Sequence, residues 1–138
     1  MHKQVTIFSD GGSRGNPGPA AIGFLILSET GQTLMVKSRY LGSRTNNQAE
    51  YEAIIEALET ALALHAKEVT CHLDSQLVVK QITGEYQVKN AALRKLWKKV
   101  QEVKSSFKKA SFINVPRTNS QIQKADALVN KALDEQFC

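Results

Sequence analysis

The sequence has only two cysteines, three histidines and no long apolar segment. Cys71 and Cys138 lack the spacing of a zinc site or a disulfide framework; we interpret both as free thiols, and the sequence leaves a bridge between them open. His2, His65 and His72 have no metal-ligand partner at suitable spacing and are interpreted as structural or surface residues. The N-terminus shows neither a signal peptide nor a membrane span, so we expect a cytoplasmic protein.

The length and charge of the chain set two further limits. With 138 residues, of which 42% are hydrophobic, it can bury one core but not two, so we expect a single domain over residues 1–138. The net charge is +5, but the segment Lys89–Lys109 alone carries eight basic residues against one acid. This segment is compatible with a polyanionic partner, and the rest of the chain can hold acidic clusters.

The periodicity of apolar residues predicts an α/β fold. Five strands are expected, at residues 5–10, 21–28, 32–41, 69–74 and 111–115. Four helices are expected, over residues 47–65, 77–82, 93–107 and from about 121 onward. The first three strands read as an antiparallel meander, and the later strands alternate with helices. The order predicts a mixed five-stranded sheet, with a meander plus parallel strands, flanked by helices.

Two acids lie at the predicted ends of strands. Asp10 ends the first strand and Asp74 ends the fourth, each at the point where the chain leaves the sheet for a glycine loop or a helix. Ligand sites in α/β sheets favour such strand ends.

Two further acids border the apolar faces of predicted helices. At about 100° per residue, Glu50 lies on the flank of the apolar stripe, whereas the other glutamates of that helix share a solvated face. The same construction places Asp126 beside Leu133, so it too is expected at the border of the core. A buried carboxylate needs a partner or a cation. Each acid taken singly also fits a capping or paired role, but four together suit a hard cation such as Mg²⁺ or Mn²⁺.

Four short strings surround these acids, namely Phe8–Ser13 with Gly15–Pro19, Thr45–Tyr51, Asp74–Gln76 and Ala125–Asn130. In this order and on these elements, they make the sequence similar to type 1 ribonuclease H along nearly its whole length. The resemblance implies a ribonuclease H-like fold and an endonuclease that cleaves the RNA strand of an RNA/DNA hybrid. It also implies a monomer that needs no membrane.

The same resemblance implies roles for the acids. The family's four metal-binding carboxylates correspond to Asp10, Glu50, Asp74 and Asp126. They imply two Mg²⁺ ions, with Mn²⁺ as an alternative, one activating a water for attack on an RNA phosphate and the other stabilising the departing 3′-oxygen. Asp10 would be the bridging ligand.

Substrate contacts are also implied by the resemblance. Three asparagines, and less strongly Gln76, correspond to residues that approach the minor groove of the hybrid: Asn16, Asn46 and Asn47. Three residues correspond to, or lie near, a pocket for a DNA-strand phosphate: Arg44, Thr45 and Asn90. For Thr45 and Asn46, ordinary helix capping is an alternative that can coexist with substrate binding.

The sequence departs from the family pattern in three places. The loop over residues 116–121 lacks the histidine that many relatives have before the last carboxylate, so Arg117 is the candidate for that catalytic role and Asn119 the second choice. A plain phosphate contact by Arg117 fits equally well. Residues 84–90 are too few for a long basic protrusion, so hybrid binding would depend on Lys89–Lys109, although part of that segment can simply solvate a helix. We also expect no separate hybrid-binding module before the first strand.

Two other functions stay open from the sequence. One is a nuclease of the same fold that acts mainly on double-stranded RNA. The other is a non-catalytic module that binds nucleic acid, and the retention of all four acids argues against it.

Overall fold

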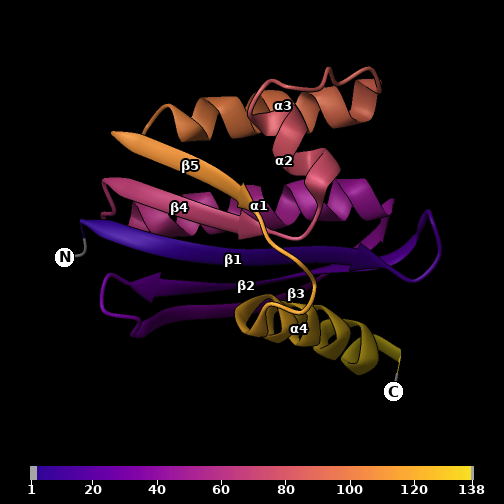
Figure 1. Ribbon diagram of the computed structural model, residues 1–138. Coiled ribbons are helices and arrows are strands. Elements are labelled where there is room, and N and C mark those ends of the chain that lie inside the picture. The colour runs from indigo at the N-terminus through magenta and orange to yellow at the C-terminus, as the bar shows by residue number, and fades with distance from the viewer. Residues whose placement is uncertain (1–2, 138) are drawn as a thin grey trace.

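The computed structural model describes residues 3–137, in which the chain forms five strands and four helices (Figure 1). The strands are β1 (Gln4–Ser13), β2 (Gly18–Ser28), β3 (Thr33–Arg44), β4 (Glu68–Leu73) and β5 (Lys109–Asn114). The helices are α1 (Asn46–Ala63), α2 (Gln76–Ile82), α3 (Ala91–Lys104) and α4 (Ser120–Phe137). No helix among the described residues is long and apolar enough to cross a membrane.

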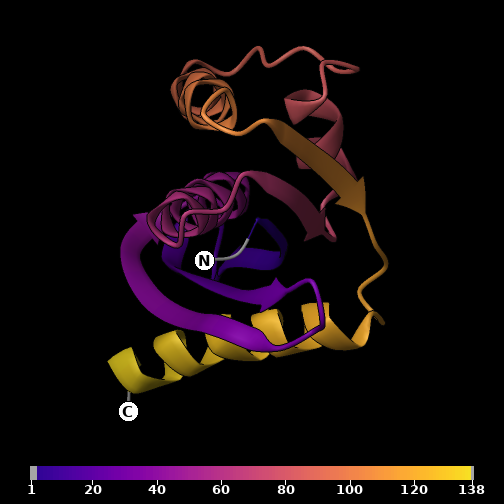
Figure 2. The same ribbon diagram turned by 90° about the vertical axis from the view of Figure 1, so that its left-hand side faces the viewer.

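The strands form one mixed sheet in the order β3-β2-β1-β4-β5. β1, β2 and β3 pair as an antiparallel meander, whereas β4 runs parallel to β1 and β5 parallel to β4. Figure 2 shows α1 and α4 on opposite sides of the sheet, and α3 beyond α1. The predicted α/β fold with a mixed five-stranded sheet is confirmed.

Helix α1 provides most of the core. Thr45 caps its N-terminus in a capping box with Gln48, which satisfies the first free backbone N–H groups. The large apolar side chains of α1 then meet those of the sheet in the main buried cluster, which includes Ile7, Ile22, Phe24, Ile54 and Leu58. The other face of the sheet carries two smaller clusters beneath α4, one around Val129 and Leu133 and one around Phe8 and Ile122.

The first strand is longer than the sequence predicted. Its expected end at Asp10 is wrong, because Gly11, Gly12 and Ser13 continue to pair with the stretch 20–22 of β2. Asp10 therefore lies inside the strand that occupies the centre of the sheet, and not at an exposed strand end.

Other element boundaries also moved by a few residues. Helix α1 ends at Ala63 and not at His65, because His65 takes a left-handed backbone with φ 65° that reverses the chain. Helix α3 ends at Lys104, so Phe107 lies beyond it, although its ring is still buried. Strands β2, β3 and β5 are also displaced or extended relative to the predicted ranges. The connection from α2 to α3, residues 83–90, contains no helix, in agreement with the expected lack of a long protrusion.

Two glycines allow the helices to approach the sheet closely. A Cβ atom on Gly11 would lie 2.2 Å from the carbonyl oxygen of Ala49 in α1. A Cβ atom on Gly23 of β2 would lie 2.4 Å from the carbonyl oxygen of Ala125 in α4. Gly11 follows Asp10 directly, and Gly23 is paired with Asp10 across the two strands. The two close contacts thus bring Glu50, which follows Ala49, and Asp126, which follows Ala125, toward Asp10.

Gly23→Ala is therefore expected to force α4 away from β2. Overpacking of this kind typically costs about 1–3 kcal/mol of unfolding free energy. Urea unfolding followed by circular dichroism measures the effect. Gly12→Ala is the matched control, because a Cβ atom there would meet its nearest neighbour at an ordinary 3.5 Å. Equal stability of the two variants would contradict the expected role of the Gly23 contact.

Candidate active site

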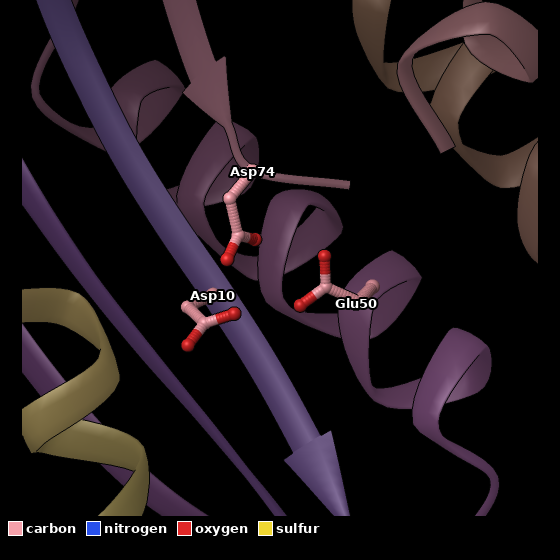
Figure 3. A group of neighbouring side chains, drawn as sticks. All are labelled: Asp10, Glu50 and Asp74. Atoms are coloured by element: carbon pink, nitrogen blue, oxygen red, sulfur yellow. The ribbon is translucent and has the colours of Figure 1, made fainter. Parts of the chain in front are cut away.

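Three carboxylates from separate elements converge at the edge of the main core. Asp10 comes from β1, Glu50 from the first turns of α1, and Asp74 directly follows β4. Figure 3 shows the three side chains pointing toward one another, and one carboxylate oxygen of each lies within 4.8 Å of those of the other two. Asp10 and Glu50 are buried, with 7% and 3% exposure, and Asp74 is half-buried.

The crowding of these acids opposes their ionisation. Burial raises the pKa of Asp10 to about 7; the hydrogen bond with Glu50 opposes this increase, and the charges of Asp74 and Asp126 add to it. Burial, followed by the charge of Asp10, raises the pKa of Glu50 well above its ordinary value. Burial also raises the pKa of Asp74, while the neighbouring charge of Arg117 lowers it. All three acids are therefore costly to ionise without a compensating positive charge.

The two oxygens of Glu50 have different environments. Oε1 accepts a hydrogen bond of 2.7 Å from the backbone N–H of Gly11. Oε2 is buried and has no hydrogen-bond partner among the described residues. An unpartnered buried carboxylate oxygen is unfavourable unless a cation or water completes its environment. Carboxylate oxygens are also the ligands that hard divalent cations prefer, so this donor set fits a divalent metal ion.

The fourth predicted acid, Asp126, lies in the same cleft but outside the cluster of three. It was expected to border the core, and it does line the cleft beside the core residues Ile122, Val129 and Leu133, but its side chain is exposed. Helix α4 packs on the sheet through Ala125, Val129 and Leu133. This packing leaves Asp126, the residue after Ala125, facing the cleft. The charge of Asp126 still contributes to the raised pKa of Asp10.

A cleft of about 490 Å³ joins these residues. All four acids line it, together with Arg14, Asn46, Arg117 and Asn130. Arg14 and Asn130 were not singled out from the sequence. The spacing of Asn130, four residues after Asp126 and so on the same helix face, was the available signal.

The loop before α4 places its two candidate residues differently. Arg117 is largely exposed, and its Nε lies 3.6 Å from Oδ2 of Asp74. The Oδ1 atom of Asn119 accepts hydrogen bonds from the backbone N–H groups of Gln121 and Ile122 at the start of α4. Asn119 therefore serves as a helix cap, which leaves Arg117 as the residue of this loop that reaches the acids.

Several predicted substrate contacts are hydrogen-bonded within the protein. The backbone N–H of Asn46 donates to Oδ1 of Asn16, and Oδ1 of Asn46 accepts from the backbone N–H of Ser13, which joins the β1–β2 loop to α1. Nε of Arg44 lies 2.8 Å from Oε2 of Glu52.

The remaining candidates occupy helix starts. Thr45 and Asn90 cap α1 and α3, so the capping role that the sequence left open for Thr45 is present. Asn47 is half-buried in the first turn of α1, and Gln76 is exposed at the start of α2.

The histidines and cysteines lie outside the acidic cluster. His72 stacks on Phe8 with ring centroids 4.5 Å apart, and His65 is exposed in the turn after α1. Cys71 is buried and is a free thiol among the described residues. His2 and Cys138 lie outside the described residues.

The sequence of the chain is similar to a known family and to known proteins over nearly its whole length. A family model described as "Reverse transcriptase-like" matches residues 8–132. Ribonuclease HI of Halobacterium salinarum is 41% identical over 132 residues, which cover 96% of this chain and 65% of that protein. A bifunctional protein of Mycobacterium tuberculosis is 40% identical over 132 residues, 95% of this chain and 36% of that protein. The chain thus spans just under two thirds of the first relative and about a third of the second.

Two solved structures resemble the chain over nearly its whole length. The crystal structure of RNase H1 from Halobacterium salinarum has a TM-score of 0.91 and 40% identity, and covers 96% of this chain and 98% of that one. The crystal structure of LC11-RNase H1 in complex with an RNA/DNA hybrid has a TM-score of 0.89 and 40% identity, and covers 97% of this chain and 99% of that one.

Proposed function

The chain belongs to the type 1 ribonuclease H family, and from this premise we propose that it hydrolyses the RNA strand of RNA/DNA hybrids with the help of divalent metal ions. The convergence of Asp10, Glu50 and Asp74 carries the proposal, together with the unpartnered buried oxygen of Glu50. Ionised carboxylates this close together are unfavourable for the folded chain unless bound cations compensate their charge. The hybrid in the structure of a relative supports the choice of substrate.

Four carboxylates would hold the ions: Asp10, Glu50, Asp74 and Asp126. Asp10 is the proposed shared ligand, because its carboxylate lies next to those of Glu50 and Asp74 and lines the same cleft as Asp126. We propose that these residues would hold two Mg²⁺ ions, with Mn²⁺ as the alternative; bound there, the ions would supply activation of a water and charge stabilisation for the departing 3′-oxygen. The chain itself fixes acids from four separate elements in place before the substrate arrives.

Asn16 and Asn46 are suited to binding in a minor groove. The carbonyl oxygens of Asn16 and Asn46 are used within the protein, so the amide NH₂ group of each is the end that can face the substrate. The minor groove of a hybrid presents 2′-hydroxyls and base acceptors that such donors can bind. We propose Asn47 and Gln76 as further contacts of this kind.

The phosphate contacts are proposed at helix N-termini. Thr45 and Asn90 begin α1 and α3, where backbone N–H groups favour an anion. The guanidinium of Arg44 can contribute positive charge if it contacts a phosphate and Glu52 at the same time. The exposed lysines of α3 extend the same positive surface.

A cleavage assay tests the function. A hybrid with a 5′-labelled RNA strand is incubated with the protein and Mg²⁺, and the fragments are resolved by length. Internal cleavage of the RNA strand, blocked by EDTA, is expected. Metal-independent binding without cleavage would instead indicate a non-catalytic module. Faster cleavage of the same RNA in an RNA/RNA duplex would indicate a nuclease for double-stranded RNA.

Arg117→Ala is expected to lower kcat/KM for the hybrid by about 10-fold, because a charge-assisted contact to phosphate is lost. An arginine stays protonated in proteins, so it acts here by its charge and not by proton transfer. Its removal also raises the pKa of Asp74, so the acidic limb of the rate–pH profile should move to higher pH. Steady-state rates between pH 5 and 9 measure both effects.

Arg117→Lys provides the comparison, because it keeps the charge and should retain part of the activity. An unchanged rate and an unchanged pH profile for Arg117→Ala would exclude a role at the acids. Because the side chain of Arg117 is largely exposed, a loss of activity in Arg117→Ala would not be explained by a folding defect.

A further inference from the structure

A chain of polar contacts runs from the β1–β2 loop to the carboxylate of Asp126. Nη2 of Arg14 lies 2.7 Å from Oδ1 of Asp134 and 3.4 Å from Oδ1 of Asn130. Nδ2 of Asn130 lies 3.3 Å from Oδ2 of Asp126 and 3.2 Å from its backbone carbonyl oxygen. The three residues of α4 are spaced by four, so they lie along one face of the helix.

The amide of Asn130 is used at both ends. Its oxygen accepts from the guanidinium of Arg14, and its nitrogen donates to the carboxylate of Asp126. Rotation of the amide by half a turn would place NH₂ against the guanidinium and oxygen against the carboxylate, and both contacts would then be repulsive. Arg14 therefore selects the orientation in which Asn130 donates to Asp126.

Arg14 is itself held in place. Its backbone N–H donates to the carbonyl oxygen of Pro19 across the loop, at 2.8 Å, and its guanidinium pairs with Asp134. The contact links the loop after β1, which carries Asp10, to the helix that carries Asp126.

Asp126 has little else to restrict it. Its side chain is exposed, unlike those of Asp10 and Glu50, which are enclosed by the core. Its carboxylate accepts a side-chain hydrogen bond from Asn130. An exposed aspartate held by one hydrogen bond keeps fewer rotamers than an unrestrained one, and so loses less entropy when it binds a cation.

We propose that Asn130 is a positioning residue for Asp126, and that Arg14, anchored by Asp134, holds Asn130 in the orientation this requires. The inference rests on the proposed function, in which Asp126 is the fourth metal-binding carboxylate. Groups that orient a metal ligand typically change affinity or activity by about 10–100-fold when they are removed. The contacts from Asn130 to its neighbours are long, so we expect the lower end of that range.

The first test separates kcat from KM in hybrid cleavage. Asn130→Ala and Arg14→Ala should each lower kcat by about 10-fold and change KM by less than about twofold. Lys131→Ala is the matched control, because Lys131 carries an exposed charge on the same helix and pairs with Glu135. It should behave as the wild type. Arg14→Lys should keep part of the activity, because Nη2 alone contacts both Asp134 and Asn130, and an ammonium group can also donate to two acceptors.

The second test needs no substrate. Calorimetric titration with Mg²⁺ alone should show an affinity about 10-fold weaker in Asn130→Ala than in the wild type. In metal-free protein, the side-chain NH₂ signals of Asn130 in ¹⁵N–¹H spectra are identified by their loss in Asn130→Ala. These signals should shift in Arg14→Ala and stay in place in Lys131→Ala.

The outcomes distinguish this inference from the proposed function. If Asp126→Asn is inactive while Asn130→Ala and Arg14→Ala keep wild-type kcat and Mg²⁺ affinity, the positioning role is wrong and the proposed function stands. If Arg14→Ala raises KM at unchanged kcat and Arg14→Lys restores it, Arg14 contacts a phosphate and the inference is overturned. If Asp126→Asn is fully active, Asp126 is not a metal-binding carboxylate, and the positioning role of Asn130 is refuted with it.

Discussion

Asp10→Asn is expected to reduce hybrid cleavage by about 10³-fold or more, at the upper end of the effects seen when a catalytic electrostatic group is removed. An amide is nearly the same size as a carboxylate but supplies no negative charge to a cation. Because Asp10 lies next to Glu50 and Asp74 and lines the same cleft as Asp126, the substitution is expected to affect every metal position proposed for the cleft. Single-turnover cleavage with excess enzyme measures the chemical step.

Glu59→Gln is the matched control for this loss. Glu59 is an exposed acid of α1 whose carboxylate lies 3.9 Å from Lys99, outside the cleft. It should cleave the hybrid at the wild-type rate. Full activity of Asp10→Asn would refute the proposed site, whereas equal losses in both variants would point to a nonspecific effect of charge.

The second expected result concerns pH and stability without metal. The pKa of Asp10 is raised from 3.8 to about 7, so ionisation is harder in the folded than in the unfolded chain. The protonated form therefore stabilises the fold below about pH 4, and this contribution is lost as the pH rises through 7. For Asp10 alone, the free energy of unfolding should fall by at most about 4 kcal/mol between low and high pH. Glu50 and Asp74 act in the same direction.

Chemical unfolding in EDTA between pH 4 and 8.5 measures this dependence. Asp10→Asn should flatten it and be more stable than the wild type at pH 8, although it is inactive. Mg²⁺ at pH 8 should restore wild-type stability, because an ion that binds only the folded state stabilises it. A wild-type stability that is constant from pH 5 to 8 in EDTA would contradict the raised pKa of Asp10.

Two of the acids show what helical periodicity can and cannot predict. The angular position of Glu50 on α1 pointed to the border of the core, and its side chain is indeed buried. The same reasoning placed Asp126 at the border of the core, yet its side chain is exposed. The angle fixes a direction around the helix axis, but the width of the surface that the helix covers depends on tertiary packing.

Asp10 shows a different limit. The glycines after it read as the start of a loop, since glycine is common in turns. In the folded chain Gly11 pairs with β2, and its missing side chain makes room for the backbone of α1. A glycine that permits close approach and a glycine that permits a turn look the same in one sequence.

The long-range contacts were beyond local patterns altogether. Arg14 and Asp134 are 120 residues apart, and neither lies in a periodic position that favours such a contact. The capping role of Thr45 was easier to predict, because Thr45 lies within a few residues of the N–H group that it binds. Its proposed substrate role depends on contacts that no local pattern encodes.

The separation of charge within the fold gives the molecule an electric dipole moment. Helix α3, which carries several exposed lysines, and helix α4 lie on opposite sides of the sheet (Figure 1). The carboxylates line the cleft that α4 borders. A polyanionic duplex that approaches such a molecule exerts a torque that turns α3 toward it before contact. The cleft repels phosphates until cations have entered it. Encounter with the substrate should therefore slow as monovalent salt rises, whereas loading of the cleft with divalent ions should quicken it.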